Sequence, residues 1–128
     1  SSDVCSSDLD EVRLSPSGLY LFASTRGLVP SQNGYVTAFS LLPSGLLASE
    51  EPLDLWRTPT SGGWANAIEP APATVSAEGA RGEEWIALTD SEEGLVMVLG
   101  WDGKRFREVA RTTLKGGAGA ATAVWLTL

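Results

Sequence analysis

The chain has 128 residues, of which 43% are hydrophobic and 20% charged, and its formal net charge is −7. This is the composition of one globular domain, and an acidic chain without a Lys/Arg cluster is a poor candidate for binding nucleic acid or anionic membranes. With no His and a single Cys, the sequence excludes within itself a Ser-His-Asp triad, a His-ligated metal and an internal disulfide. We therefore expect no cofactor and no metal and, since the start lacks the features of a secretory signal, a cytoplasmic location.

The first nine residues, SSDVCSSDL, repeat Ser-Ser-Asp on both sides of Cys5 and show no strand pattern. The repeat resembles a translated sequencing adapter, and nothing later in the chain uses it again. We therefore interpret residues 1–9 as an artefact fused to a truncated gene. A natural disordered tail is the alternative.

The first structural unit is expected over residues 10–63. Short apolar segments alternate with turn residues, and they predict strands at residues 11–14, 19–25, 34–41 and 46–56. Two Pro-Ser-Gly sequences, at residues 16–18 and 43–45, predict tight turns, because Pro fixes φ and Gly accepts a positive φ. Strands joined in this order predict one antiparallel sheet.

The second unit, residues 64–114, repeats this pattern about 60 residues later. Strands are expected at residues 64–69, 84–90, 94–101 and 106–114, with a hairpin turn at Asp102-Gly103. Residues 115–128 are expected to form a loop and the terminal strand of a further unit. The predicted fold class is thus all-β: a β-propeller fragment of about two four-stranded antiparallel blades plus a final strand. A β-sandwich is the alternative.

Because neighbouring strands in such a sheet run in opposite directions, every second connection between strands lies at the same end of the sheet. One end, called the turn end here, receives the tight turns and the connection at residues 70–82. The other, called the loop end, receives the irregular, charged or Gly-rich connections at residues 26–33, 58–63, 91–93 and 115–119. Function on rigid β scaffolds concentrates on such loops, so the loop end is the predicted active face.

Several segments match one known family in order. They are SPSGLYLFASTRG at residues 15–27, GYVTAFSL at 34–41, TPTSGGWANAIEPAP at 58–72, EEWIALTDSEEGLVMVLGWD at 83–102, FREVAR at 106–111 and AVWL at 123–126. Together they resemble the fungal 3-carboxy-cis,cis-muconate lactonizing enzymes, or carboxymuconate cyclases, which are seven-bladed β-propellers of the lactonase type. The resemblance covers residues 10–128. It implies that the chain is the C-terminal part of a longer enzyme, with the missing N-terminal blades as its partner.

The resemblance also implies a chemistry. The expected reaction is cycloisomerisation in aromatic-compound catabolism, in which a carboxylate of a muconate adds across a double bond and forms a lactone. Its small anionic substrate needs cations, and Arg26 matches the family's arginine, so it is the expected substrate-carboxylate ligand. Pairing with a neighbouring acid, or simple solvation, is the alternative for Arg26. Asn66 is a second candidate, as a hydrogen-bond donor to substrate or to its own backbone.

The catalytic residues are not identified. Because the chain has no His, the general acid is expected in the missing blades, and the fragment alone is expected to be inactive. Trp64-Ala65 stands where the family tends to carry His-Ser, and Thr122 where it tends to carry Asn, which leaves the substrate open. The alternatives are a lactone hydrolase of the 6-phosphogluconolactonase-like type and a propeller that only scaffolds protein contacts.

Two other features have a structural and a functional interpretation. Asp90, Glu92 and Glu93 are expected to be a solvated loop, with a carboxylate acid/base pair or a Ca²⁺ site as the alternative. The five Trp residues are expected to pack between blades, with a sugar-stacking surface as the alternative.

Overall fold

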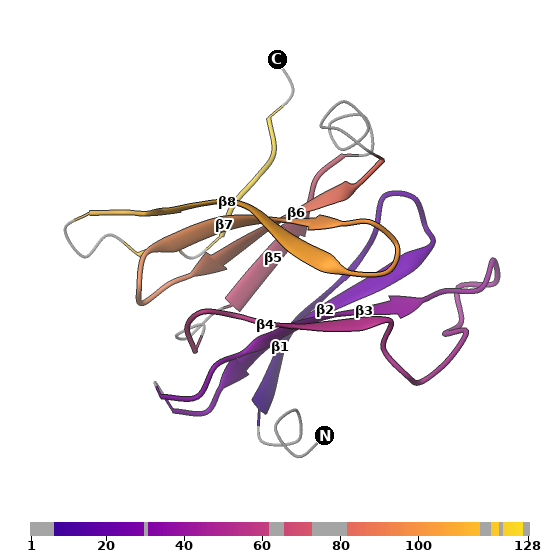
Figure 1. The fold of residues 1–128 in the computed structure, drawn as a ribbon, viewed down its shortest axis with the longest axis horizontal. Helices are drawn as coiled ribbons and strands as arrows, with labels where there is room; N and C mark the ends of the chain where they lie inside the picture. Colours follow the sequence, from indigo (N-terminus) through magenta and orange to yellow (C-terminus); the bar gives the residue numbers. More distant parts are fainter. Residues whose placement is uncertain are drawn as a thin grey trace.

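The computed structural model describes residues 7–29, 31–61, 66–72, 82–115, 119–120 and 122–126, without the side chains of residues 7–10 and 66. Within these residues the chain forms strands and no helix, which confirms the predicted all-β class. The strands make two four-stranded antiparallel sheets that lie one above the other, with β4 and β8 toward the viewer (Figure 1). Two such meanders are consistent with a fragment of a β-propeller. No helix in the described part could span a membrane.

The strands follow the chain in order within each sheet. The first sheet consists of β1 (Ser7–Leu14), β2 (Tyr20–Gly27), β3 (Tyr35–Ser40) and β4 (Asp54–Arg57). The second sheet consists of β5 (Asn66–Pro70), β6 (Glu84–Asp90), β7 (Leu95–Trp101) and β8 (Phe106–Thr113).

Three expected strands differ from the structure. β1 begins at Ser7, so three residues of the suspected adapter pair with β2, and the ladder shifts register between Leu9 and Glu11, where the adapter was expected to end. β4 is four residues long instead of the predicted 46–56, because the segment after the second Pro-Ser-Gly turn keeps only an isolated bridge between Leu41 and Leu47. The artefact origin of residues 1–9 stays a prediction.

The predicted final strand is also absent from residues 122–126, the part of that segment that the structure describes. A strand needs a neighbour with which to exchange backbone hydrogen bonds. Here the segment is instead held by a side chain: the Trp125 indole N–H donates to the Glu69 carbonyl at 2.8 Å, and its ring stacks on Trp85. Trp125 therefore holds this segment against β5 and β6 of the second sheet.

The two sheets are structural repeats. The N–H of Ser15 donates to the Tyr20 carbonyl, as Ala71 donates to Trp85 in the second sheet. At the other end the N–H of Thr58 donates to Gly34, as Leu114 donates to Gly94. These matched bonds make Tyr20 the equivalent of Trp85, and Gly34 the equivalent of Gly94. The pairing register of the strands then assigns an equivalent in the second sheet to each remaining residue of β2 and β3.

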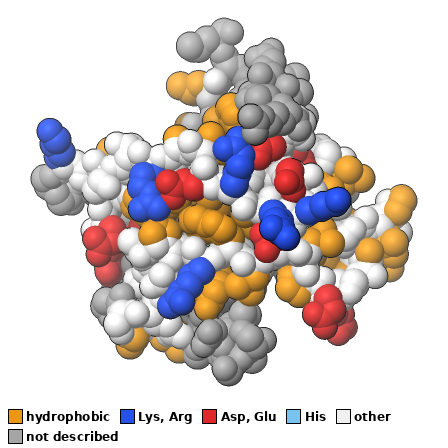
Figure 2. Space-filling view, in the orientation of Figure 1, with side chains coloured by type: hydrophobic (Ala, Val, Ile, Leu, Met, Phe, Trp, Pro, Cys, Tyr) orange, Lys and Arg blue, Asp and Glu red, His pale blue; other side chains and the backbone are white. Residues whose placement is uncertain are grey.

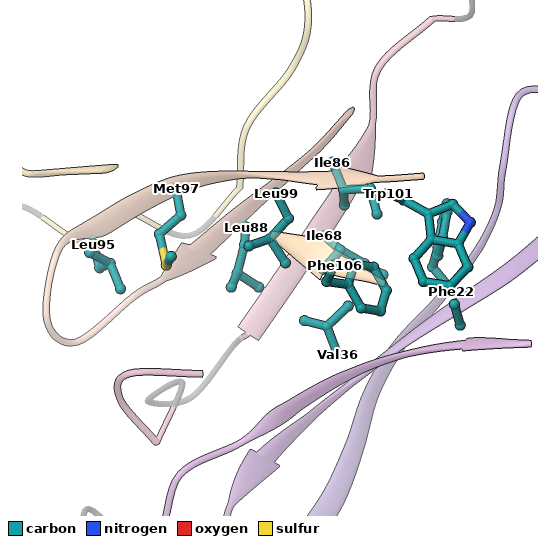
Figure 3. Packing of buried hydrophobic residues seen from close by; sticks show 11 residues of the cluster. Phe22, Val36, Ile68, Ile86, Leu88, Leu95, Met97, Leu99, Trp101 and Phe106 are labelled. Carbon is teal, nitrogen blue, oxygen red and sulfur yellow. The ribbon is translucent and has the colours of Figure 1, made fainter. Parts of the chain in front are cut away.

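The core lies between the sheets. Figure 3 shows side chains of the second sheet, among them Ile86, Leu88 and Trp101, pointing toward Phe22 and Val36 of the first. Phe22 and Val36 are fully buried. We call the side of each sheet that takes part in this contact its near face, and the opposite side its outer face.

Aromatic rings join the two sheets near the turn end. Tyr20 meets Trp101 edge to face with ring centroids 5.4 Å apart, and Phe22 lies 6.1 Å from Phe106. Such pairs add about 0.5–1.5 kcal/mol each beyond their area. The packing interpretation of the Trp residues is thus confirmed for Trp101 and for Trp56, which packs against the same cluster. Trp64 lies outside the described residues.

Candidate functional site

The loop end is built by backbone hydrogen bonds between segments distant in the sequence. The N–H of Gly27 donates to the Ser61 carbonyl at 2.8 Å, and that of Gly34 to the Thr60 carbonyl at 3.2 Å. The Asn33 side-chain amide donates to the Thr58 carbonyl at 2.6 Å. The connection after β2 and the segment after β4 therefore hold each other in place at the edge of the first sheet.

Gly27 is required by a close approach of the backbone. A Cβ at this position would lie 1.8 Å from the carbonyl oxygen of Gln32, far inside van der Waals contact. The loop can fold back over the end of β2 only because no side chain stands there. The Gln32 side chain closes the same loop, since its Oε1 accepts the N–H of Leu28 at 3.1 Å.

Asp90, at the end of β6, links the loops of the two sheets. Its side chain is almost fully buried, and its Oδ1 accepts the backbone N–H groups of Glu92 and Glu93 at 2.9 and 3.1 Å. Its Oδ2 accepts a hydrogen bond from the Thr60 hydroxyl. One carboxylate therefore organises its own turn and fastens the first sheet's loop to the second sheet.

The acidic cluster is thus a turn around a buried carboxylate, because Glu92 and Glu93 are exposed while Asp90 is not. Within the described part of the chain, no group of three His, Cys, Asp or Glu residues is placed to hold a metal ion. In its bonds to Thr60, Glu92 and Glu93, the Asp90 carboxylate serves as a hydrogen-bond acceptor.

The structure brings both candidate site residues to the loop end. Arg26 is the penultimate residue of β2, half-buried, and shares a face of that strand with the core residue Phe22 and the buried Ser24. Asn66 opens β5, where it pairs with Asp90. Both therefore lie at the loop end of the seam between the sheets. This placement by itself assigns them no ligand, so their roles stay predictions.

Sequence reasoning missed the residues that hold this end together. Thr60, Ser61 and Gly27 were noted only as parts of segments that match the family, and their bonding could not be predicted because their partners lie far away in the sequence. Asp90 was noticed only as one of three acids. Its position at the last residue of a strand, followed by a turn, was the available signal for a buried turn acceptor. Trp64, Ala65 and most of the loop before Thr122 lie outside the described residues.

Comparison with known proteins finds two relatives. The chain is 44% identical over 121 residues to "muconate cycloisomerase 1" of Cutaneotrichosporon cutaneum, a match that covers 91% of this chain and 31% of that protein. It is 34% identical over 124 residues to "carboxy-cis,cis-muconate cyclase" of Neurospora crassa, covering 97% of this chain and 29% of that protein. The chain thus spans less than a third of the length of either relative. No family model matches the chain.

Proposed function

Because the similarity to these relatives supports the assignment of the chain to the carboxymuconate cyclase family, we propose that the longer protein is a cycloisomerase that converts a muconate to a lactone. The observation that carries this proposal is the extent of the match, which runs over 91% and 97% of the chain to two proteins named for muconate chemistry. We place the protein in the cytoplasm and in aromatic-compound catabolism, and this stretch of it within a β-propeller.

The proposed reaction needs no redox step. A carboxylate oxygen adds to one carbon of the conjugated diene, so that a C–O bond forms as the π bond breaks, and a general acid delivers a proton to the adjacent carbon. The substrate carries at least two carboxylates before ring closure. A site for it needs fixed cations, and a planar guanidinium can hold a carboxylate through two parallel hydrogen bonds.

Arg26 is proposed to hold one substrate carboxylate. Three observations support this role: its place at the loop end, its position on the near face of β2, and the anchoring of its neighbour Gly27 to Ser61. A cation positions an anion well only if its own backbone is fixed. Asn66, paired with Asp90, is proposed as a further hydrogen-bond donor on the same seam.

We place the general acid in the part of the longer protein that lies outside this stretch. The chain contains no His, and Asp90 is occupied as an acceptor of hydrogen bonds from the protein itself. The 128-residue chain alone is therefore expected not to turn over a muconate. Activity in this chain alone would overturn that placement.

The test uses the full-length protein and carboxymuconate, whose conjugated diene absorbs in the ultraviolet and disappears on ring closure. Arg26→Ala should lower kcat/KM by about 10- to 100-fold, as expected for a lost charged hydrogen bond of about 1.5–3 kcal/mol. Arg26→Lys should recover little, because an ammonium is a point charge. Arg57→Ala is the matched control: this exposed arginine also lies at the loop end of the first sheet, on the outer face opposite Tyr35.

Wild-type kcat/KM in either Arg26 variant would refute the role of Arg26. A protein that leaves the diene unchanged but hydrolyses a sugar lactone would instead be a lactone hydrolase on the same scaffold. A protein that does neither would be left as a scaffold for protein contacts.

A further inference from the structure

The end of β2 that carries Arg26 extends beyond the pairing of this strand with β3. The ladder between the two strands ends at the pair of Thr25 and Tyr35, so Arg26 and Gly27 lie past it. Beside Gly27, the segment after β4 takes the position that β3 would otherwise occupy, since the Gly27 N–H donates to the Ser61 carbonyl at 2.8 Å. On this side, the backbone next to Arg26 is therefore supported by a segment that belongs to no strand.

The neighbour on the other side is β1. There, Arg26 pairs with Asp8 and Gly27 with Ser7, which are residues of the suspected adapter. Ser61, in contrast, lies in the segment of residues 58–72 that resembles the family. The segment after β4 is therefore the support of Arg26 to be expected in the longer protein as well.

Thr60, the residue before Ser61, is bonded to both sheets. Its carbonyl accepts the N–H of Gly34 at 3.2 Å and the Thr58 hydroxyl at 2.6 Å, and these bonds tie it to the first sheet. Its hydroxyl donates to Oδ2 of Asp90 in the second sheet. Thr60 is therefore a point at which the segment supporting the end of β2 is fixed to the second sheet.

Asp90 is a rigid acceptor for the Thr60 hydroxyl. Its side chain is only 1% exposed, and its Oδ1 accepts the N–H groups of Glu92 and Glu93 at 2.9 and 3.1 Å. Its backbone belongs to β6 and pairs with Asn66 of β5. A carboxylate held in this way cannot follow a moving partner, so the position of Asp90 determines the position of Thr60.

The packing around Gly27 leaves little room for the loop to absorb a shift of Ser61. The Gln32 carbonyl lies so close to Gly27 that a Cβ there would be 1.8 Å from its oxygen. The Asn33 amide also ties this loop to the segment after β4, through the carbonyl before residue 59 at 2.6 Å. A displacement of Ser61 would therefore move Gly27, and with it the adjacent Arg26.

We propose that Thr60 is a positioning residue, whose bond to Asp90 holds Arg26 at the distance from Asn66 that the substrate requires. The inference rests on the proposed role of Arg26 and adds a residue that acts through it. The two candidate ligands come from different sheets, so their separation depends on how the sheets are joined at the loop end. Figure 1 shows the connections that follow β2 and β6 on the same side of the molecule. A misplacement of about 1 Å can cost a reaction up to about 100-fold in rate.

The test uses the full-length protein and the ultraviolet assay of ring closure. Thr60→Val removes the hydroxyl at nearly constant volume and should lower kcat/KM by about tenfold, and by no more than Arg26→Ala does. Thr60→Ser keeps the hydroxyl and should stay within about twofold of the unmodified protein. If Thr60→Val does not fold, Thr60→Ala replaces it. Unchanged kcat/KM in Thr60→Val, beside a loss in Arg26→Ala, would overturn the inference and leave the proposed function standing.

Two readouts separate positioning from a loss of folded protein. Partial unfolding lowers kcat and leaves KM unchanged, whereas Thr60→Val should divide its loss between kcat and KM in the same proportion as Arg26→Ala. Thr60→Val added to Arg26→Ala should cost less than about twofold, because the residue through which Thr60 acts is already gone. A full tenfold loss in the double variant would show that Thr60 does not act through Arg26.

Two control variants remove similar bonds elsewhere. Thr37→Val removes another buried threonine hydroxyl, which donates to the Ala23 carbonyl at 3.3 Å in the middle of the first sheet. Asp54→Ala removes another bond between the sheets, from the Phe106 N–H at 2.9 Å, at the turn end. Figure 2 shows the face formed by β4 and β8, which that bond joins, with basic and acidic side chains interspersed, so the loss of one charge there should affect substrate attraction little.

Both control variants should keep kcat/KM within about twofold of the unmodified protein. A tenfold loss in either would show that any loosening of the sheets lowers activity, and the positioning role would then be refuted.

A protein that leaves the muconate unchanged would refute the proposed function, and a second measurement then decides the positioning. Hydrogen exchange of the Gly27 N–H should be faster in Thr60→Val than in the unmodified protein, and unchanged in Thr37→Val. An unchanged exchange rate in Thr60→Val would show that Asp90 does not hold the end of β2 through Thr60, and the inference would fall.

Discussion

The turn end and the loop end close the same strands in opposite ways. At the turn end, the three tight turns are closed by bonds of their own: Gly18 donates to Ser15, Gly45 donates to Leu42, and the carboxylate of Asp102 accepts two N–H groups of its own turn. One further bond, from the N–H of Ser17 to Glu84 Oε1 at 3.2 Å, joins the first of these turns to the second sheet. At the loop end, the segment after β2 bonds the segment after β4, and that segment bonds the second sheet through Asp90.

This difference shows where a change should stay local and where it should spread. A turn made of sequence neighbours can lose one bond without moving any other element. At the loop end, Asp90 is bonded to Thr60, and the next residue, Ser61, is bonded to Gly27, which is the neighbour of the candidate ligand Arg26. Disturbing any member should loosen the whole end. Matched changes at the two ends test this contrast.

The largest effect is expected at the two glycines. Gly27→Ala places a Cβ 1.8 Å from the Gln32 carbonyl oxygen and should cost more than about 3 kcal/mol of unfolding free energy. Gly18→Ala, at the turn end, meets no atom within 4 Å and should cost only the strain of its positive φ, about 1–2 kcal/mol. Chemical denaturation measures both. Equal losses would remove the distinction between the ends.

A smaller difference is expected at the two turn carboxylates. Asp90→Ala leaves the Thr60 hydroxyl and two backbone N–H groups without their buried acceptor and should cost about 2–3 kcal/mol. Asp102→Ala removes a similar pair of bonds on an exposed turn, where water replaces the lost oxygen, and should cost much less. Hydrogen exchange should show faster exchange of the N–H groups of Gly27 and Gly34 in the Asp90 variant alone. Faster exchange of those groups in the Asp102 variant would contradict local independence of the turn end.

The smallest effect is a pH dependence at the turn end. The backbone N–H groups of Arg105 and, next, Lys104 hold the pKa of Asp102 below its ordinary value of 3.8. A carboxyl whose pKa is lower in the folded state adds stability above the unfolded pKa, and that stability is lost as the pH falls through the folded pKa. Between about pH 5 and about pH 3, Asp102→Asn should therefore lose slightly less unfolding free energy than the unmodified chain. Parallel pH profiles would disprove this contribution.

The same contrast explains what the sequence could predict. The turns at residues 16–18 and 102–103 were predictable because their chemistry is local, and the short apolar segments between turn residues identified the strands around Phe22 and Leu88. The length of β4 was not predictable, because pairing with β3 and not propensity decides where it begins. The bond from Thr60 to Asp90 joins residues of different sheets, and only the packing of those sheets brings them together.

The hydrogen bond between Thr60 and Asp90 also has a thermodynamic consequence. It joins the two sheets at the end where Arg26 and Asn66 lie, so a molecule bound across both loops would oppose the parting of the sheets. By linkage, such a ligand raises the free energy of unfolding by RT ln(1 + [L]/Kd). Because Trp101 is buried between the sheets, we expect its fluorescence to change when they separate. A higher melting temperature of the protein, followed by this fluorescence, would then report a ligand bound at the loop end, which Trp101 does not contact.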